Sequence, residues 1–230
     1  MNLESHEPKT KVFSIDIETY TLGPVADKYT DEKDYKLGNV KDPDKIKAAL
    51  KKKREDARRT HALHWFTGKV ISVALVDVLG DEAELCLSSH DEKELLTELA
   101  GRLNRPCKLV GKSSDMFDYG FLVGRYMANN LEVPGVLKRR EKLFDIDKFF
   151  SWSAQSSQRG SLQDYAFGLD MEGKTMKGSD VAELYSQIIV DEMETGITSP
   201  LWQDLIEYNL QDARIVADLT RRYIGKEGVL

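Results

Sequence analysis

Acidic residues with the spacing of a metal site occur in three separated segments of this chain. In the first, "FSIDIE", Asp16 and Glu18 alternate with apolar residues. Side chains two residues apart on a strand point to the same face of a sheet, so both carboxylates lie on one face. Such a pair repels unless a cation lies between its members, and Mg²⁺ and Mn²⁺ prefer oxygen ligands of this kind. The pattern alone is weak evidence, because "FDID" offers Asp145 and Asp147 with the same geometry.

Two further segments each add one aspartate that could join such a site. In "LVGKSSDMFDYGFL", a buried strand ends at Gly111, and Asp118 follows on a predicted helix among apolar and aromatic side chains, so its carboxylate needs a partner. In "IEYNLQDARIVADL", Tyr208 and Asp212 are four residues apart on a predicted helix and therefore share one face. A tyrosine hydroxyl beside a metal-bound carboxylate can orient or help to deprotonate water, although a half-buried packing role is the simpler interpretation of Tyr208 on the helix alone.

The rest of the pattern describes the elements that must position these residues. Period-2 alternation predicts a strand over Lys11–Glu18 whose apolar face lies opposite the two acidic residues. The other predicted elements are, in chain order, strands over 68–78 and 82–89 joined by a turn at Gly80 and Asp81, a helix over 91–103, a strand over 107–112, a helix over 115–130, a short strand within 141–150, and helices from 161 onward, the longest starting near Pro200. This succession indicates a layered α/β or α+β domain that no linker divides.

The segment "GLDMEGKT", Gly168–Thr175, matches the pattern of a phosphate-binding loop, but its surroundings do not fit. Such a loop needs a buried strand before it and a helix that begins at its Lys-Thr pair. Here Ser161 and Asp164 have capping-box spacing, which predicts a helix that ends at Gly168. We interpret the segment as a loop between helices, which makes hydrolysis of a nucleoside triphosphate the weakest candidate function.

In order and spacing, the three acidic segments resemble the motifs of the DEDD superfamily of 3′–5′ exonucleases, which share a ribonuclease-H-like fold. The motifs are D-x-E on the first strand, an aspartate in a G-x-x-x-x-x-F-D segment, and Y-x-x-x-D near the C-terminus, together spanning Phe13–Leu219. The chain looks most like the polymerase-associated DEDDy branch, which "SLQDYAFGLD" and "DVAELY" also resemble. The histidine-bearing sister branch does not fit, because the last histidine is His90. The implied fold is α/β, a ribonuclease-H-like mixed five-stranded sheet flanked by helices, with residues 1–230 as a single exonuclease domain.

The resemblance implies a metal-dependent 3′–5′ exonuclease that releases nucleoside 5′-monophosphates by a two-metal-ion mechanism. Two divalent ions, Mg²⁺ or Mn²⁺, would be held by the four acidic residues, with Tyr208 helping to place the attacking water. The family meets the terminal nucleotide at the positions of Thr19 and Tyr20, and Phe121 is a weaker candidate for stacking on a base. Single-stranded DNA is favoured over RNA, and any polymerase partner would act in trans. The four acidic residues are Asp16, Glu18, Asp118 and Asp212.

Two features depart from the family pattern. Lys112 and Ser113 stand where the family often has His-Asn, which leaves the metal ligands intact but raises the question of how the end of that strand is held. A basic segment, predicted as a helical insertion around residues 44–60, carries eight basic and two acidic residues between Lys45 and Arg59. It either contacts phosphates or merely solvates an amphipathic helix whose apolar stripe includes Ile46 and Leu50.

Composition limits the remaining possibilities. The chain has 230 residues and a net charge of −6, with ordinary fractions of apolar and charged residues. No apolar run approaches the roughly 20 residues of a membrane span, and the first residues lack the apolar core of a secretory signal, so we expect a cytoplasmic protein without a membrane partner. Cys86 and Cys107 lack the spacing of a zinc site or a disulfide framework and are expected to be idle thiols.

Two classes of function compete after this comparison. The favoured class is the active exonuclease, within which an endonuclease or a ribonuclease of the same fold stays open. The alternative is a catalytically silent ribonuclease-H-like scaffold that binds nucleic acid or a polymerase. Four intact acidic residues argue against the scaffold, because clustered buried charge is costly to a protein that does not use it.

Overall fold

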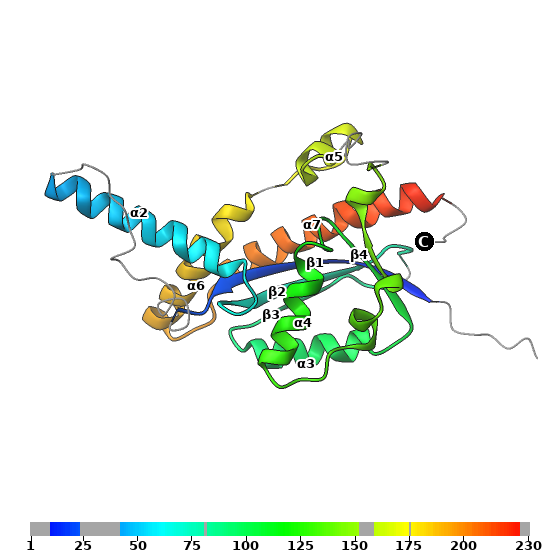
Figure 1. Ribbon diagram of the computed structural model, residues 1–230, viewed down its shortest axis with the longest axis horizontal. Coiled ribbons are helices and arrows are strands. Elements are labelled where there is room, and N and C mark those ends of the chain that lie inside the picture. The colour runs from blue at the N-terminus through cyan, green and yellow to red at the C-terminus, as the bar shows by residue number, and fades with distance from the viewer. Residues whose placement is uncertain (1–9, 24–41, 81, 152–158, 175, 226–230) are drawn as a thin grey trace, which may run out of the picture.

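One mixed sheet of five strands forms the centre of the molecule (Figure 1). The computed structural model describes residues 10–23, 42–80, 82–151, 159–174 and 176–225. The strand order is β3-β2-β1-β4-β5, with β1 antiparallel to β2 and parallel to β4, β2 antiparallel to β3, and β4 parallel to β5. The strands are β1 (Lys11–Thr21), β2 (Gly68–Asp77), β3 (Leu85–Ser88), β4 (Cys107–Gly111) and β5 (Leu143–Asp145).

Helices cover both faces of this sheet, which confirms the predicted α/β class and the ribonuclease-H-like mixed sheet flanked by helices. Helices α3 and α4 pack on one face, and the long α7 crosses the other face in contact with β1 to β4 (Figure 1). The helices are α2 (Pro43–Ala62), α3 (Glu92–Leu103), α4 (Asp118–Ala128), α5 (Leu162–Gly168), α6 (Val181–Thr195) and α7 (Leu201–Ile224). Short 3₁₀ turns lie at Gly135–Lys138, Arg140–Lys142, Ile146–Lys148 and Gly178–Asp180. No helix in the described ranges is long and apolar enough to cross a membrane.

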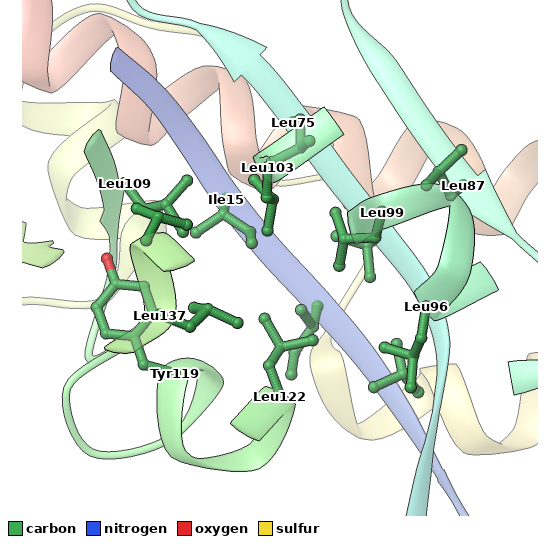
Figure 2. Close-up of a cluster of buried hydrophobic side chains, with 14 of the residues drawn as sticks. Ile15, Leu75, Leu87, Leu96, Leu99, Leu103, Leu109, Tyr119, Leu122 and Leu137 are labelled. Atoms are coloured by element: carbon green, nitrogen blue, oxygen red, sulfur yellow. The ribbon is translucent and has the colours of Figure 1, made fainter. Parts of the chain in front are cut away.

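Alternation along β1 decides which face each side chain serves. Phe13, Ile15 and Ile17 enter the core beneath α3 and α4, where Figure 2 draws Ile15 among leucines of β2, α3 and α4. The next residues along the strand face α7, and the Ser14 hydroxyl donates to the carbonyl of Ala213 at 2.6 Å. The even-numbered positions of β1 therefore meet α7, and Asp16 lies among them.

Several element boundaries differ from the sequence prediction. Strand β1 continues to Thr21 beyond the predicted end at Glu18, because β2 keeps pairing with it across a bulge between Glu18 and Thr19. The third strand is shorter than predicted, and α4 starts three residues later than expected, after a turn in which Ser113 has a φ of 55°. The predicted turn at Gly80 and Asp81 falls partly outside the described residues; Gly80 itself has a φ of 77°.

The helix before the phosphate-loop pattern forms as predicted. Ser161 caps α5 in a complete capping box with Asp164. The helix ends at Gly168, but the left-handed residue after it is Asp170, with a φ of 53°, so the glycine is not used for its backbone freedom. Helix α5, and not a strand, comes directly before the pattern, and the next elements described after it are the 3₁₀ turn Gly178–Asp180 and α6. Thr175 lies outside the described residues. Residues 169–174 form a loop, as predicted.

Candidate metal centre

Three carboxylates from the two ends of the chain converge beside the sheet. Asp16 and Glu18 of β1 and Asp212 of α7 each offer an oxygen, and these oxygens all lie within 4.8 Å of one another. The convergence follows from the fold, since α7 covers the face of β1 on which the acidic residues lie. Oxygen donors at this separation match the preference of hard divalent cations.

Burial and mutual repulsion raise the pKa values of carboxyl groups in this cluster above their ordinary range. Burial, followed by the charge of Asp212, raises the pKa of Glu18 to about 8. Burial and the neighbouring carboxylates, first Glu18, raise the pKa of Asp16 well above its usual range, and burial also raises that of Asp212. The Oδ1 atom of Asp212 is buried without a hydrogen-bond partner among the described residues. The cluster therefore has more negative charge than nearby cations neutralise, and it has a carboxylate oxygen to which no described donor is hydrogen-bonded.

Asp118 lies beside this cluster, at the first residue of α4. Its side chain is 4 % exposed and accepts a hydrogen bond of 2.5 Å from the Ser114 hydroxyl. Burial raises the pKa of Asp118 to about 7, and its charge in turn raises the pKa of both Asp16 and Glu18. Asp118 is therefore electrically part of the cluster, although the group of oxygens within 4.8 Å consists of Asp16, Glu18 and Asp212.

The end of β4 leaves no room for a side chain at Gly111, and this holds Ser114 and Asp118 in place. A Cβ at Gly111 would lie 1.9 Å from Ser114 Oγ, 2.8 Å from Ser114 Cβ and 3.1 Å from the carbonyl oxygen of Ile15.

We expect Gly111→Ala to lower the free energy of unfolding by about 1–3 kcal/mol, measured by urea denaturation. Gly101→Ala, in α3 with nothing within 4 Å of the new Cβ, is the control and should be neutral or stabilising. Equal losses in both variants would contradict the close packing at Gly111.

The tyrosine of the third motif is buried against the same site. Tyr208 is 2 % exposed, and its hydroxyl lies 3.5 Å from where a Cβ on Gly178 would be. Burial and then the charge of Glu18 raise the pKa of the Tyr208 phenol, so its hydroxyl stays protonated at neutral pH. The next residue, Asn209, is fully buried; with its amide nitrogen turned toward β1 it donates to Asp16 Oδ2 at 3.2 Å and holds that carboxylate.

Lys174 reaches the cluster from the loop after α5, a role that the sequence interpretation missed. Its ammonium is 2.5 Å from Asp212 Oδ2 and 5.1 Å from the centre of the Tyr208 ring. Its charge lowers the pKa of Asp16, Glu18 and Asp212, which partly offsets their repulsion. The loop is anchored there because the Lys174 backbone N–H donates to Gln163 Oε1 at 2.8 Å. The residue belongs to the phosphate-loop pattern, and its spacing gave no sign of an acidic partner.

The rival acidic pair, Asp145 at the end of β5 and Asp147 in the 3₁₀ turn after it, has different partners. Asp145 accepts from the backbone N–H of Ser113 at 3.0 Å, and Asp147 accepts from Lys112 Nζ at 3.1 Å, Ser113 Oγ at 2.8 Å and the Tyr165 hydroxyl at 2.9 Å. Burial alone would raise the pKa of Asp147, but these hydrogen bonds outweigh burial and keep it below its usual value. This pair binds Lys112 and Ser113, the residues that replace the family's His-Asn, and so holds the turn before Asp118.

The three predicted substrate-binding residues have different environments. Thr19 lines a hollow of about 360 Å³ beside Glu18, and Tyr20 lines an adjoining hollow of about 390 Å³, with its hydroxyl 2.9 Å from Ser186 Oγ. Phe121 is 3 % exposed and belongs to the core under α4, so its ring is not at the surface of either hollow. Phe117, one helical turn earlier, lines the hollow beside Glu18 instead.

Comparison with known proteins adds evidence about the fold. No protein-family model matches the sequence, and a comparison with curated proteins finds no match. Among the solved structures that resemble the chain is the family B DNA polymerase from the hyperthermophilic archaeon Pyrobaculum calidifontis, with a TM-score of 0.56 and 14% sequence identity over 94% of this chain. The likeness is one of fold. The match takes in 25% of the polymerase chain, so this chain spans about a quarter of that protein's length.

Proposed function

We propose that the chain is a metal-dependent 3′–5′ exonuclease acting on single-stranded DNA, of the DEDDy type. The observation that carries this proposal is the convergence of Asp16, Glu18 and Asp212 within 4.8 Å, with one buried Asp212 oxygen lacking a partner. Buried carboxylates with raised pKa values in a hollow are typical of functional sites. The likeness to a DNA polymerase supports a nucleic-acid substrate.

The residues present fit two divalent cations such as Mg²⁺ or Mn²⁺. The donors are hard oxygens, and the unpaired Asp212 oxygen offers a free acceptor. Asp16, Glu18 and Asp212 would hold the ions together with Asp118, whose charge is coupled to the other three. Bound ions would supply a water activated for attack and would stabilise the leaving 3′ oxygen.

The chain's own residues would orient the substrate and the water. The Tyr208 hydroxyl stays protonated at neutral pH, so it can donate a hydrogen bond to the attacking water without carrying charge. Thr19, which lies in the hollow next to Glu18, would meet the terminal nucleotide. Asn209 and Ser114 keep Asp16 and Asp118 in position. The product is a nucleoside 5′-monophosphate.

A 5′-labelled single-stranded DNA oligonucleotide tests the proposal. With Mg²⁺ or Mn²⁺ we expect a ladder that shortens from the 3′ end, and with EDTA we expect intact substrate. An RNA copy of the oligonucleotide then measures the sugar preference. A strand that stays intact under every metal but is retarded on a gel would contradict the enzyme and would favour the binding scaffold.

Neutralising Lys174 should tighten metal binding. The ammonium competes with a cation for Asp212 and lowers the negative potential of the cluster, so both effects oppose a metal ion. We expect Lys174→Gln to bind Mn²⁺ about fivefold more tightly, measured by titration calorimetry, since such a change corresponds to about 1 kcal/mol. Lys112→Gln removes a lysine of similar burial from the rival pair and should leave Mn²⁺ affinity unchanged. Weaker Mn²⁺ binding by Lys174→Gln would show that the lysine supports the ion instead.

A further inference from the structure

A continuous groove leads from the acidic cluster toward α2. The hollow beside Glu18 and the hollow beside Tyr20 share three lining residues, Arg59, Ala62 and Ala182. Their volumes are about 360 and 390 Å³. We call the two together the α2 groove. One wall of the groove is formed by the last turns of α2, which contribute Glu55, Arg58, Arg59 and Ala62.

Two arginines of α2, Arg58 and Arg59, line this groove. Arg58 and Arg59 both line it and are exposed, and neither guanidinium has a hydrogen bond or ion pair with any residue in the described ranges. Two carboxylates, Glu55 and Glu183, also line the groove, so its charge is mixed at this end. Unpaired guanidinium groups are the donors that recognise phosphate oxygens by paired hydrogen bonds.

The apolar stripe of α2 lies on the side away from the groove. At about 100° per residue, Lys51 falls roughly 25° and Lys52 roughly 75° from the groove-facing direction set by Arg58, Arg59 and Ala62. The opposite side of the helix carries four apolar residues, Ile46, Ala49, Leu50 and Ala57. The groove side also carries two alanines, Ala48 and Ala62, of which Ala62 is buried. The basic side of the helix is therefore directed to the groove and its continuation.

Helix α2 extends this basic side away from the body of the protein. Figure 1 shows its C-terminal end against the sheet and its N-terminal end projecting outward, consistent with its contacts to β1 and β2. Since a helix rises about 1.5 Å per residue, Lys51 lies about 12 Å farther out than Arg59. A polymer that left the acidic cluster through the groove would meet first the arginines and then the lysines.

We propose that the α2 groove binds the phosphates of a single nucleic-acid strand upstream of the nucleotide being cleaved, with Arg58 and Arg59 as the first contacts and Lys51 and Lys52 as later ones. The proposal rests on the proposed exonuclease function, because the acidic cluster fixes where the strand ends. Charge complementarity and continuity with that cluster select this occupant. A basic helix on an otherwise acidic chain also confines the strand to one path.

The test measures binding of 5′-fluorescein-labelled dT12 and dT4 by fluorescence anisotropy, with Ca²⁺ replacing Mg²⁺. Arg58→Gln/Arg59→Gln should weaken binding of both oligonucleotides by about tenfold. The slope of log K against log salt should fall by about 1.4, because each phosphate contact on a single strand contributes about 0.7. Lys51→Gln/Lys52→Gln should weaken binding of dT12 only.

A matched control separates local contacts from net charge. Lys93→Gln/Arg102→Gln removes the same charge from exposed positions of α3 and should bind both oligonucleotides like the wild type. Equal losses in this control, or unchanged binding by the arginine variant, would overturn the proposal, and the latter would leave an acidic protein partner as the alternative for the groove. Lysine variants that affect dT4 as much as dT12 would overturn the proposed direction of the strand.

A second measurement distinguishes an error in the groove proposal from an error in the proposed exonuclease function. Hydrolysis of thymidine 5′-(4-nitrophenyl phosphate) by the wild type with Mn²⁺ reports the acidic cluster without any upstream phosphate. Hydrolysis together with unchanged binding by the arginine variant rejects the groove alone. Absence of hydrolysis and of Mn²⁺ binding by the wild type rejects the exonuclease, and the groove proposal with it.

Discussion

Asp212→Asn should slow shortening of a 5′-labelled strand by about a thousandfold or more, whereas Asp147→Asn should leave the rate within about threefold. The two aspartates are closely matched. Each is buried and each is paired with a lysine, Lys174 at 2.5 Å for Asp212 and Lys112 at 3.1 Å for Asp147. They differ in that Asp212 keeps an unpaired oxygen and a raised pKa, while Asp147 is fully engaged and has a lowered pKa.

We expect Asp147→Asn to lower the free energy of unfolding more than Asp212→Asn does, which is the reverse of their expected effects on the rate. Asp147→Asn replaces one of the two carboxylate oxygens that accept from Lys112, Ser113 and Tyr165 by an NH2 group, and it leaves the Lys112 ammonium without a charged partner. We therefore expect a loss of about 2–4 kcal/mol by urea denaturation in EDTA. Asp212→Asn relieves repulsion among carboxylates while losing one ion pair, so we expect a change within about 1 kcal/mol. Rates are compared per folded molecule. If both variants lose turnover equally, the distinction between catalytic and structural acidic pairs is wrong.

The protein in EDTA should lose stability as the pH rises from 5 to 9, and Mn²⁺ should restore it. Burial and repulsion raise the pKa of Glu18 to about 8 and that of Asp118 to about 7, and they raise those of Asp16 and Asp212 as well. The folded chain therefore binds more protons than the unfolded chain between about pH 4 and 8. The free energy of unfolding must fall as the pH rises through that window. Below it, the acidic cluster is protonated in both states and causes no loss.

Thermal unfolding checks this expectation directly. We expect the midpoint in EDTA to fall by about 5–10 °C between pH 5 and 9, since about 1 kcal/mol corresponds to 2–4 °C for a chain of this size. Mn²⁺ at about a hundred times its dissociation constant should add about 2.7 kcal/mol at the higher pH. Glu18→Gln removes one of the repelling charges and should show a smaller decline in EDTA. A midpoint that rises with pH in EDTA, or is indifferent to Mn²⁺ at pH 8, would contradict the cation site.

The parts of the site that sequence could predict are those that depend on local periodicity. Alternation along β1 placed Asp16 and Glu18 opposite the apolar residues, and the helical spacing placed Tyr208 and Asp212 on one face. The meeting of these two faces could be expected only from the resemblance to a family, because no local pattern states which helix covers which face of a sheet. The described strand order, with β1 at its centre, supplies that missing information.

The remaining parts depend on contacts between distant segments. The local sequence of "FDID" does not distinguish it from "SIDIE". The difference is that Lys112, Ser113 and Tyr165 donate hydrogen bonds to Asp147 and not to the pair on β1. The loop position of Lys174 against Asp212 is likewise set by tertiary anchoring through Gln163. Phe121 was expected to stack on a base, but the packing of α4 turns its ring into the core.

The acidic cluster joins the beginning of the chain to its end. Asp16 and Glu18 lie on the first strand described, Asp212 on the last helix, and the Ser14–Ala213 hydrogen bond links residues 199 positions apart. During synthesis, β1 leaves the ribosome long before α7, so Asp212 joins Asp16 and Glu18 only after the residues of α7 have been made. A nascent chain would therefore carry an incomplete metal centre.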